Sequence, residues 1–239
     1  MKMLLLFLFY LINLFSSQPS EINEKSTCDN REKNTLKNEN IFFSEYVYKP
    51  HSLSLTNIQL LQLIGILEQF KPNNICEFGT GVTTDIFEFY CKKYNKNLLT
   101  IEHNKKYKRV HSKMFNLHTK KDIVIDNVKY KQTNIYEGLE NFFKKYDKKF
   151  DLVLVDAPIG ETNKYKYGRI QMIDFLVFDL LENEGYFLIH NTEKSCIYNS
   201  FTVLISLFKK KNYNTVIEDL GYKNNKRLTI IYFKKKGSE

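Results

Sequence analysis

Apolar and polar residues alternate along the chain in two rhythms, one with the spacing of helices and one with the spacing of strands. Leu60, Leu63, Ile64 and Leu67 recur every three or four residues, as on one face of a helix, and Thr56 ahead of them is a favourable N-cap. Beyond Pro72, short apolar runs alternate with amphipathic stretches. The runs predict strands at 74–78, 97–103, 122–134, 150–158 and 185–191, and the stretches predict helices at 83–94, 105–115, 135–146, 169–184 and 197–211.

Strands that alternate with helices predict a mainly parallel sheet covered by helices on both faces. The run Leu152-Val153-Leu154-Val155 is apolar at every position, which suits a strand buried on both sides. The end of the chain, 215–235, reads as two strands around a turn near Asn224 and Asn225. Because no helix separates these two strands, they predict an antiparallel edge.

The N-terminus differs in composition from the rest of the chain. Lys2 precedes an apolar run at 3–15 that only Asn13 interrupts, and small polar residues follow. This is the layout of a signal peptide, and the run is short for a membrane span. We interpret 1–20 as a signal peptide or membrane anchor, with an apolar helix packed on the domain as the alternative. Residues 21–40 then form a linker, and 41–239 form one full-sized domain.

The formal net charge of +9 comes from lysines scattered among Asn and Tyr, which favours a solvated surface over an anionic partner. The densest clusters, 209–211 and 234–236, lack the aromatic interleaving of a nucleic-acid module, so we predict no nucleic-acid partner. The four cysteines contain no Cys-x-x-Cys pair. They therefore indicate neither a zinc site nor a disulfide framework.

Ligands of open parallel sheets bind beyond the carboxyl ends of the strands, so the residues just after each predicted strand are the site candidates. Glycines at the start of a helix let the backbone approach a ligand closely, and a carboxylate after the second strand suits two ribose hydroxyls. The glycine pattern lacks the third glycine of the dinucleotide fingerprint, which disfavours NAD. The candidates are Glu77, Gly79 and Gly81 after the first strand, Glu102 after the second, Asn134 near the third, Asp156 after the fourth, and His190 with Asn191 after the fifth.

Four of these segments carry a resemblance to a known family. The glycine loop at 77–81, "LLTIEHN", "FDLVLVDAP" and "ENEGYFLIHNTEK" resemble, in order and spacing, the motifs of class I methyltransferases that use S-adenosylmethionine. The match covers about 52–234. It implies an α/β, doubly wound Rossmann-like methyltransferase fold, with a mainly parallel seven-stranded sheet and an antiparallel edge strand. It also implies S-adenosylmethionine as cofactor, bound by Glu77, Gly79, Gly81, Glu102 and Asn134.

A narrower resemblance concerns the acceptor. "VDAPIG", Gly168-Arg169 and "FLIHNTEK" resemble sugar-directed O-methyltransferases, including plant glucuronoxylan 4-O-methyltransferase-like proteins and enzymes of bacterial polysaccharide clusters. This implies a glycan or another small hydroxyl acceptor. Asn191 stands where that group carries a carboxylate, and the difference puts an acid/base or metal role at this position in question.

Methyl transfer to a hydroxyl requires aligned reactants and an acceptor that loses its proton. Asp156 is the first candidate to orient or deprotonate the acceptor, and His190 is the second. The alternative role of Asp156 is to cap a turn, and the alternative for His190 is a hydrogen-bonded position in the core. Together with Asn191 they form a conceivable divalent-metal site, as in catechol-type O-methyltransferases. We predict no metal, because hard cations prefer oxygen ligands to a histidine nitrogen.

The polar segment 159–169 precedes the next predicted helix. Tyr165 and Tyr167 are candidates for stacking on a sugar, and Arg169 is a candidate for binding an acidic group. An ordinary surface loop is the alternative. We assign no role to His103, His111 or His118.

The sequence thus predicts an S-adenosylmethionine-dependent methyltransferase that modifies a hydroxyl of a sugar or another small acceptor. An inactive scaffold with the same fold remains an alternative. A polyamine-synthase-like enzyme is a third option, but it usually needs an acidic pair where only Asp156 is present. The leader favours the secretory pathway or a membrane-anchored location, with possible membrane association through 3–15. A cytoplasmic location is the alternative, since S-adenosylmethionine is made there.

Overall fold

A computed structural model describes residues 55–158, 166–220 and 227–237, all within one structural unit, Val47–Glu239. The predicted leader and linker lie outside the described residues. So do 159–165 of the predicted substrate segment, including Tyr165, and the predicted turn near Asn224.

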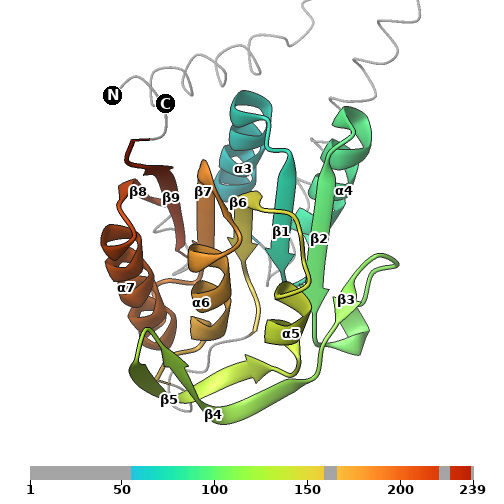
Figure 1. Ribbon diagram of the computed structural model, residues 1–239. Helices are drawn as coiled ribbons and strands as arrows, with labels where there is room; N and C mark the ends of the chain where they lie inside the picture. The colour runs from blue at the N-terminus through green and yellow to red at the C-terminus, as the bar shows by residue number, and fades with distance from the viewer. Residues whose placement is uncertain (1–54, 159–165, 221–226, 238–239) are drawn as a thin grey trace, which may run out of the picture. The chain divides into compact units, whose positions relative to one another are not determined.

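A seven-stranded sheet with the order β3-β2-β1-β6-β7-β9-β8 forms the centre of this unit (Figure 1). The strands from β3 to β7 pair in parallel, and β9 is antiparallel to both of its neighbours. The predicted doubly wound, mainly parallel seven-stranded sheet is confirmed. The strands are β1 Asn74–Phe78, β2 Asn97–Glu102, β3 Lys113–Met114, β6 Phe150–Val155, β7 Leu181–His190, β8 Tyr213–Leu220 and β9 Leu228–Lys235.

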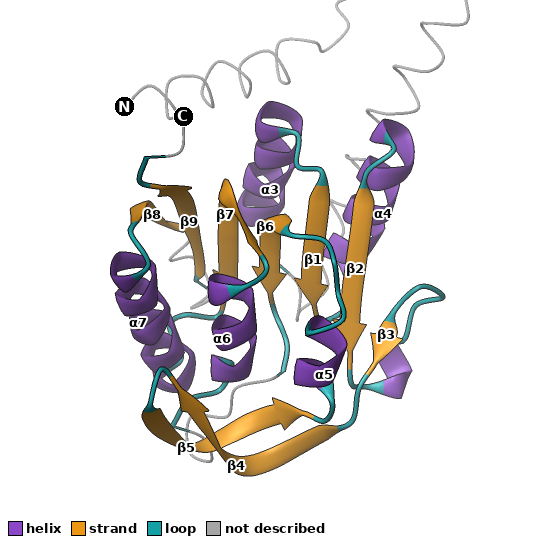
Figure 2. Ribbon diagram, viewed as in Figure 1, coloured by secondary structure: helices purple, strands orange, loops and turns teal. Residues whose placement is uncertain are grey.

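Helices cover both faces of the sheet, as Figure 2 shows: α3 and α4 lie behind it, and α5, α6 and α7 lie in front. Their bounds are α3 Asn57–Phe70, α4 Val82–Tyr94, α5 Leu139–Phe143, α6 Ile170–Phe178 and α7 Ser195–Lys210. Thr56 and Gln59 form a capping box at the start of α3, and Lys71, in the left-handed conformation, ends the helix before Pro72. The predicted apolar face of α3 is buried.

The centre of the sheet is buried on both faces. Every residue of β6 is buried, which explains why this strand carries no alternation of polar and apolar residues. The one acidic residue in it, Asp151, accepts the N–H groups of Asn73 and Asn74 at 2.7 and 2.9 Å. These two bonds fix the start of β6 beside the start of β1.

The predicted helix at 105–115 is wrong. The chain forms only a short 3-10 turn, η1, at Lys105–Tyr107 and then enters β3. Tyr107 and Val110 mimic helical spacing, but Val110 is 89% exposed and Tyr107 41% exposed. A segment with this many lysines and no apolar face to bury gains too little from packing to hold a helix.

The predicted strand at 122–134 is part of a hairpin that stands apart from the main sheet. Strands β4 (Leu117–Ile125) and β5 (Val128–Tyr136) pair with each other as a separate antiparallel sheet. Asp126 and Asn127 form the turn, with φ of 51° and 64°, as two-residue hairpin turns require. In Figure 1 the parallel strands run downward and this hairpin crosses below them.

The predicted helix at 169–184 is too long at its C-terminal end. Helix α6 ends at Phe178, and Leu181 already pairs with Phe150 of β6. Glu184 pairs with Lys234 of β9. Strand pairing therefore overrides the helical propensity of the Leu and Glu residues at 180–184.

Candidate functional site

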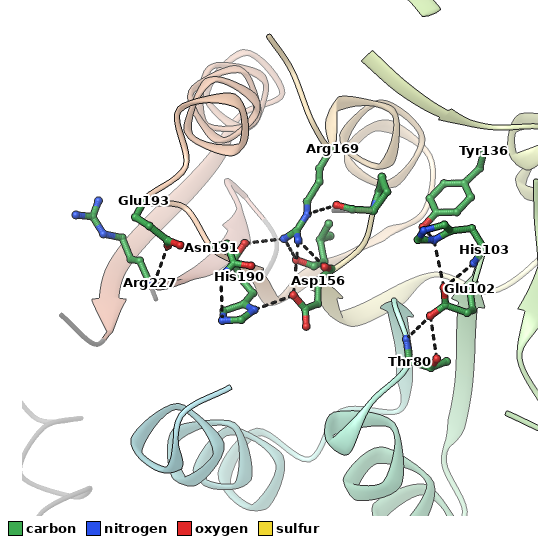
Figure 3. A network of polar contacts seen from close by, with 12 residues as sticks. Thr80, Glu102, His103, Tyr136, Asp156, Arg169, His190, Asn191, Glu193 and Arg227 are labelled. Carbon is green, nitrogen blue, oxygen red and sulfur yellow. Dashed lines mark hydrogen bonds and ion pairs between the residues drawn. The ribbon is translucent and has the colours of Figure 1, made fainter. Parts of the chain in front are cut away.

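Polar side chains gather in two groups at the carboxyl ends of the parallel strands (Figure 3). We call them the Glu102 group, beside the ends of β1 and β2, and the Asp156 group, beside the ends of β6 and β7. The Glu102 group consists of Thr80, Glu102, His103 and Tyr136, and the Asp156 group of Asp156, Arg169, His190 and Asn191. The structure thus places most of the predicted site residues at one edge of the sheet.

The loop after β1 needs glycine at its first position. Gly79 has φ of +96°, and a Cβ there would lie 2.8 Å from the Cβ of Ala157. Its N–H donates to the carbonyl of Ile101 at 2.8 Å, which holds the loop against β2. A Cβ on Gly81 would meet no atom within 4 Å. The structure therefore leaves open space beside the backbone at the start of α4.

Glu102 ends β2 and is buried, with 3% of its side chain exposed. Its Oε2 accepts the N–H and the hydroxyl of Thr80, both at 2.8 Å. Its Oε1 accepts the N–H groups of His103 at 2.7 Å and Asn104 at 2.8 Å. Burial alone would raise the pKa of Glu102, but hydrogen bonds from the side chain of His103, the N–H of Asn104 and both donors of Thr80 outweigh it and lower the pKa to about 2. The carboxylate is therefore charged at neutral pH.

Hydrogen bonds from Thr80, His103 and Asn104 surround this carboxylate, and Nδ1 of His103 also lies 3.2 Å from Oε1. A ligand hydroxyl can bind Glu102 only where one donor moves away. The hydroxyl of Thr80 is the donor with a second acceptor in reach, because the carbonyl of Tyr107 lies 2.5 Å from it. Thr80 is thus the residue that has to adjust when a ligand hydroxyl binds Glu102.

His103 lies within the Glu102 group, although the sequence predicts no role for it. Its Nδ1 lies 3.2 Å from Oε1 of Glu102 and 3.3 Å from the hydroxyl of Tyr136. Tyr136 is fully buried; burial, with a smaller contribution from the charge of Glu102, raises its pKa, so the phenol keeps its proton. The sequence signal for His103 is its position directly after the strand-end carboxylate of Glu102.

Glu77 lies under the glycine loop and has no exposed surface. Its carboxyl group accepts the hydroxyls of Thr83 at 2.5 Å and Thr100 at 3.4 Å. Burial raises the pKa of Glu77 to about 8 against these hydrogen bonds, and the charge of Asp156 adds to the rise. Glu77 therefore connects β1, β2 and α4 beneath the predicted cofactor loop, and its side chain has no surface available to a ligand.

Asp156 and His190 form a pair across the ends of the neighbouring strands β6 and β7. Their Oδ1 and Nδ1 atoms lie 2.7 Å apart, and the side chains are 30% and 1% exposed. Asn191, with φ of 62°, places its amide nitrogen 3.4 Å from Nε2 of His190. Because the carboxylate only accepts, the network assigns the imidazole proton to Nδ1. Asp156 is the more exposed member of the pair.

Arg169 is only 2% exposed, and its guanidinium donates to backbone carbonyls. Nη1 binds the carbonyls of Val155 at 2.8 Å and His190 at 2.6 Å, and Nε binds that of Pro158 at 3.1 Å. Burial lowers the pKa of Arg169, which the charge of Asp156 opposes. The expected contact of Arg169 with an acidic substrate group finds no support in this position. The residue instead holds the ends of β6 and β7 together.

The remaining predicted residues lie at the hairpin. Tyr167 packs edge to face on Tyr130 of β5, with ring centroids 4.9 Å apart, and Asn134 of β5 is 1% exposed. The hairpin thus contacts the segment that leads into Arg169. Within the described part of the chain, no cluster of three or more His, Cys, Asp or Glu side chains is arranged to hold a metal ion.

Solved structures show which fold this chain shares. A methyltransferase from Podospora anserina matches with 14% identity over 89% of this chain and 100% of that chain, with a TM-score of 0.50. This chain has a Rossmann-like methyltransferase fold. The O-methyltransferases TomG from Streptomyces achromogenes (12% identity, 94% and 96% of the two chains) and from Bacillus cereus (13%, 95% and 96%) each give a TM-score of 0.49. By sequence, no protein-family model and no curated protein matches this chain.

Proposed function

We propose that this protein is an S-adenosylmethionine-dependent methyltransferase that acts on a hydroxyl group. The Asp156–His190 pair carries this proposal, because it puts a proton acceptor at the same edge of the sheet as Glu102 and the glycine loop. Ligands of this kind of sheet bind at that edge. The Podospora protein with the same fold was crystallised with S-adenosylhomocysteine, which supports the choice of cofactor.

The residues after β1 and β2 fit such a cofactor. Gly81 leaves its backbone open at the start of α4, and Glu102 is an anionic acceptor suited to ribose hydroxyls once the hydroxyl of Thr80 turns toward Tyr107. The cofactor, when bound, supplies an electrophilic methyl group on a sulfonium. The chain's own task is then to orient the acceptor oxygen and remove its proton.

Asp156 is the residue that meets the acceptor, because it is the exposed member of the pair. Its Oδ1 is held by Nδ1–H of His190, which leaves Oδ2 to accept the hydrogen bond of the acceptor hydroxyl. The hydroxyl oxygen loses its proton to this carboxylate as it gains the methyl group. Buried His190 positions the carboxylate and stabilises its charge. The sequence resemblance to sugar-directed enzymes supports a glycan as the acceptor.

A transfer assay with isotope-labelled methyl groups tests the proposal on the full chain, with oligosaccharides as acceptors. Asp156→Asn is expected to lower the rate by about 10²- to 10⁴-fold while calorimetry finds cofactor affinity unchanged. Glu193→Gln, an exposed change after the neighbouring strand β7, is the matched control and should keep the wild-type rate. A wild-type rate in Asp156→Asn would refute this role. Cofactor binding without transfer to any hydroxyl would refute the reaction.

A further inference from the structure

Lysines that are scattered along the sequence come together at the amino-terminal edge of the sheet, opposite the two polar groups. Six segments meet at this edge, at 68–74, 92–97, 144–150, 179–184, 209–214 and 234–237, where β1, β2 and β6 begin and α4 and α7 end (Figure 1). We call their fourteen lysines the lysine edge: Lys71, Lys92, Lys93, Lys96, Lys144, Lys145, Lys148, Lys149, Lys209, Lys210, Lys211, Lys234, Lys235 and Lys236. The same segments hold five carboxylates: Glu68, Asp147, Asp179, Glu182 and Glu184.

Hydrogen bonds show that these segments are neighbours. The N–H of Lys236 donates to the carbonyl of Asn212 at 2.8 Å, so the two densest lysine clusters of the sequence form one surface. Further along the edge, the ammonium of Lys96 binds the side chain of Asn73 at 2.7 Å. That of Lys148 binds Asn97 at 2.8 Å.

The fourteen lysines of the edge outnumber its five carboxylates. The ion pair of Lys234 with Glu184 at 3.2 Å lies inside it, whereas Lys144 and Lys210 pair with carboxylates on α5 and in the hairpin turn. All fourteen lysines except Lys96 and Lys234 are exposed. The edge is therefore an exposed surface with an excess of positive charge, although the sequence predicts a dispersed excess.

We propose that the lysine edge docks on an anionic lipid bilayer. Its positive charges are all lysine, and its aromatic residues are at least partly buried. Recognition of nucleic acid favours planar arginines and exposed stacking rings, whereas flexible point charges suit a plane of lipid phosphates. The apolar run at 3–15 is a second membrane signal in the sequence, and stable attachment generally needs two. In this orientation the predicted active crevice, at the opposite edge, faces away from the bilayer.

Vesicle flotation of the full chain tests this docking. Vesicles of phosphatidylcholine alone are compared with vesicles that contain about 30 mol% phosphatidylserine, at low and high salt. The test variant changes Lys149, Lys209 and Lys236 to Gln, and the control changes Lys105, Lys106 and Lys108 to Gln. Both triples are exposed and remove the same charge, but the control residues follow β2 at the opposite edge.

The wild type should bind anionic vesicles preferentially and lose this preference in high salt. The edge variant should partition about a hundredfold more weakly, since each lysine near an anionic surface contributes about fivefold, while the control stays near the wild type. Equal binding to both vesicle types, or equal loss in the two triples, would overturn the proposal. The proposal would also be overturned if a single-stranded oligonucleotide bound the protein with the same dependence on the edge lysines and displaced it from the vesicles.

Discussion

Glu77 makes the stability of this protein depend on pH in an unusual direction. Its carboxyl group is fully buried, and burial raises its pKa to about 8 from an ordinary value near 4.5. Between these two values the unfolded chain releases this proton and the folded protein keeps it. The contribution of Glu77 to stability therefore falls as the pH rises through this window.

The size of the effect follows from the two pKa values. Each pH unit between them removes about 1.4 kcal/mol, so the whole window removes about 5 kcal/mol. Glu77→Gln preserves the size of the side chain and an acceptor for the hydroxyl of Thr83, but it has no proton to lose. We therefore expect Glu77→Gln to resemble the wild type near pH 5 and to exceed it by several kcal/mol near pH 8.5.

Urea unfolding at half-unit steps from pH 5 to 8.5 measures this difference. Glu184→Gln is the control: that carboxyl is 40% exposed, and hydrogen bonds from Tyr232 and Lys234 lower its pKa, so it does not titrate in this range. The free-energy difference between wild type and Glu77→Gln should widen with pH, and the control should run parallel to the wild type. Parallel profiles for Glu77→Gln would mean that Glu77 is ionised in the folded protein and would refute the reasoning.

Three further substitutions test the construction of the site. Arg169→Met leaves buried carbonyls at the ends of β6 and β7 without donors, so it should lower the free energy of unfolding by about 3 kcal/mol. An unchanged midpoint of urea unfolding would argue against a role of Arg169 in holding these strand ends together. Gly79→Ala should cost about 1–3 kcal/mol because of its positive φ and its contact with Ala157, whereas Gly81→Ala should be nearly neutral; equal effects would contradict the geometry. Thr80→Val removes a donor that competes with the ligand for Glu102, so it should tighten S-adenosylmethionine binding about fivefold in calorimetry. Thr80→Ser keeps the hydroxyl and should bind like the wild type. Weaker binding by Thr80→Val would show that the hydroxyl assists the ligand.

The sequence predicts the main sheet because its signals are local and strong. The fully apolar β6 requires cover on both faces, and the apolar stripe, cap and Pro72 define α3 from neighbouring residues alone. The strand-end rule then places Glu102, Asp156 and His190 at one edge without knowledge of any contact. The structure confirms this part of the fold.

Features that depend on distant contacts could not be predicted in this way. The start of β7 at Leu181 is decided by pairing with β6 and β9, against local helical propensity. The buried position of Arg169 depends on carbonyls from two other strands. The hairpin is different, because its turn has a local signal: Asp126-Asn127 lies between two β-rich runs. The prediction of a strand at 122–134 does not use this signal.

Calorimetric titration of the full chain with S-adenosylmethionine is the most direct test of the central claim. Circular dichroism would first establish that the wild type and Glu102→Gln are folded. We predict one-to-one binding by the wild type, weakened at least tenfold in Glu102→Gln because a charged acceptor for two hydroxyls is lost. A folded wild-type chain that binds neither S-adenosylmethionine nor S-adenosylhomocysteine would contradict the proposed function.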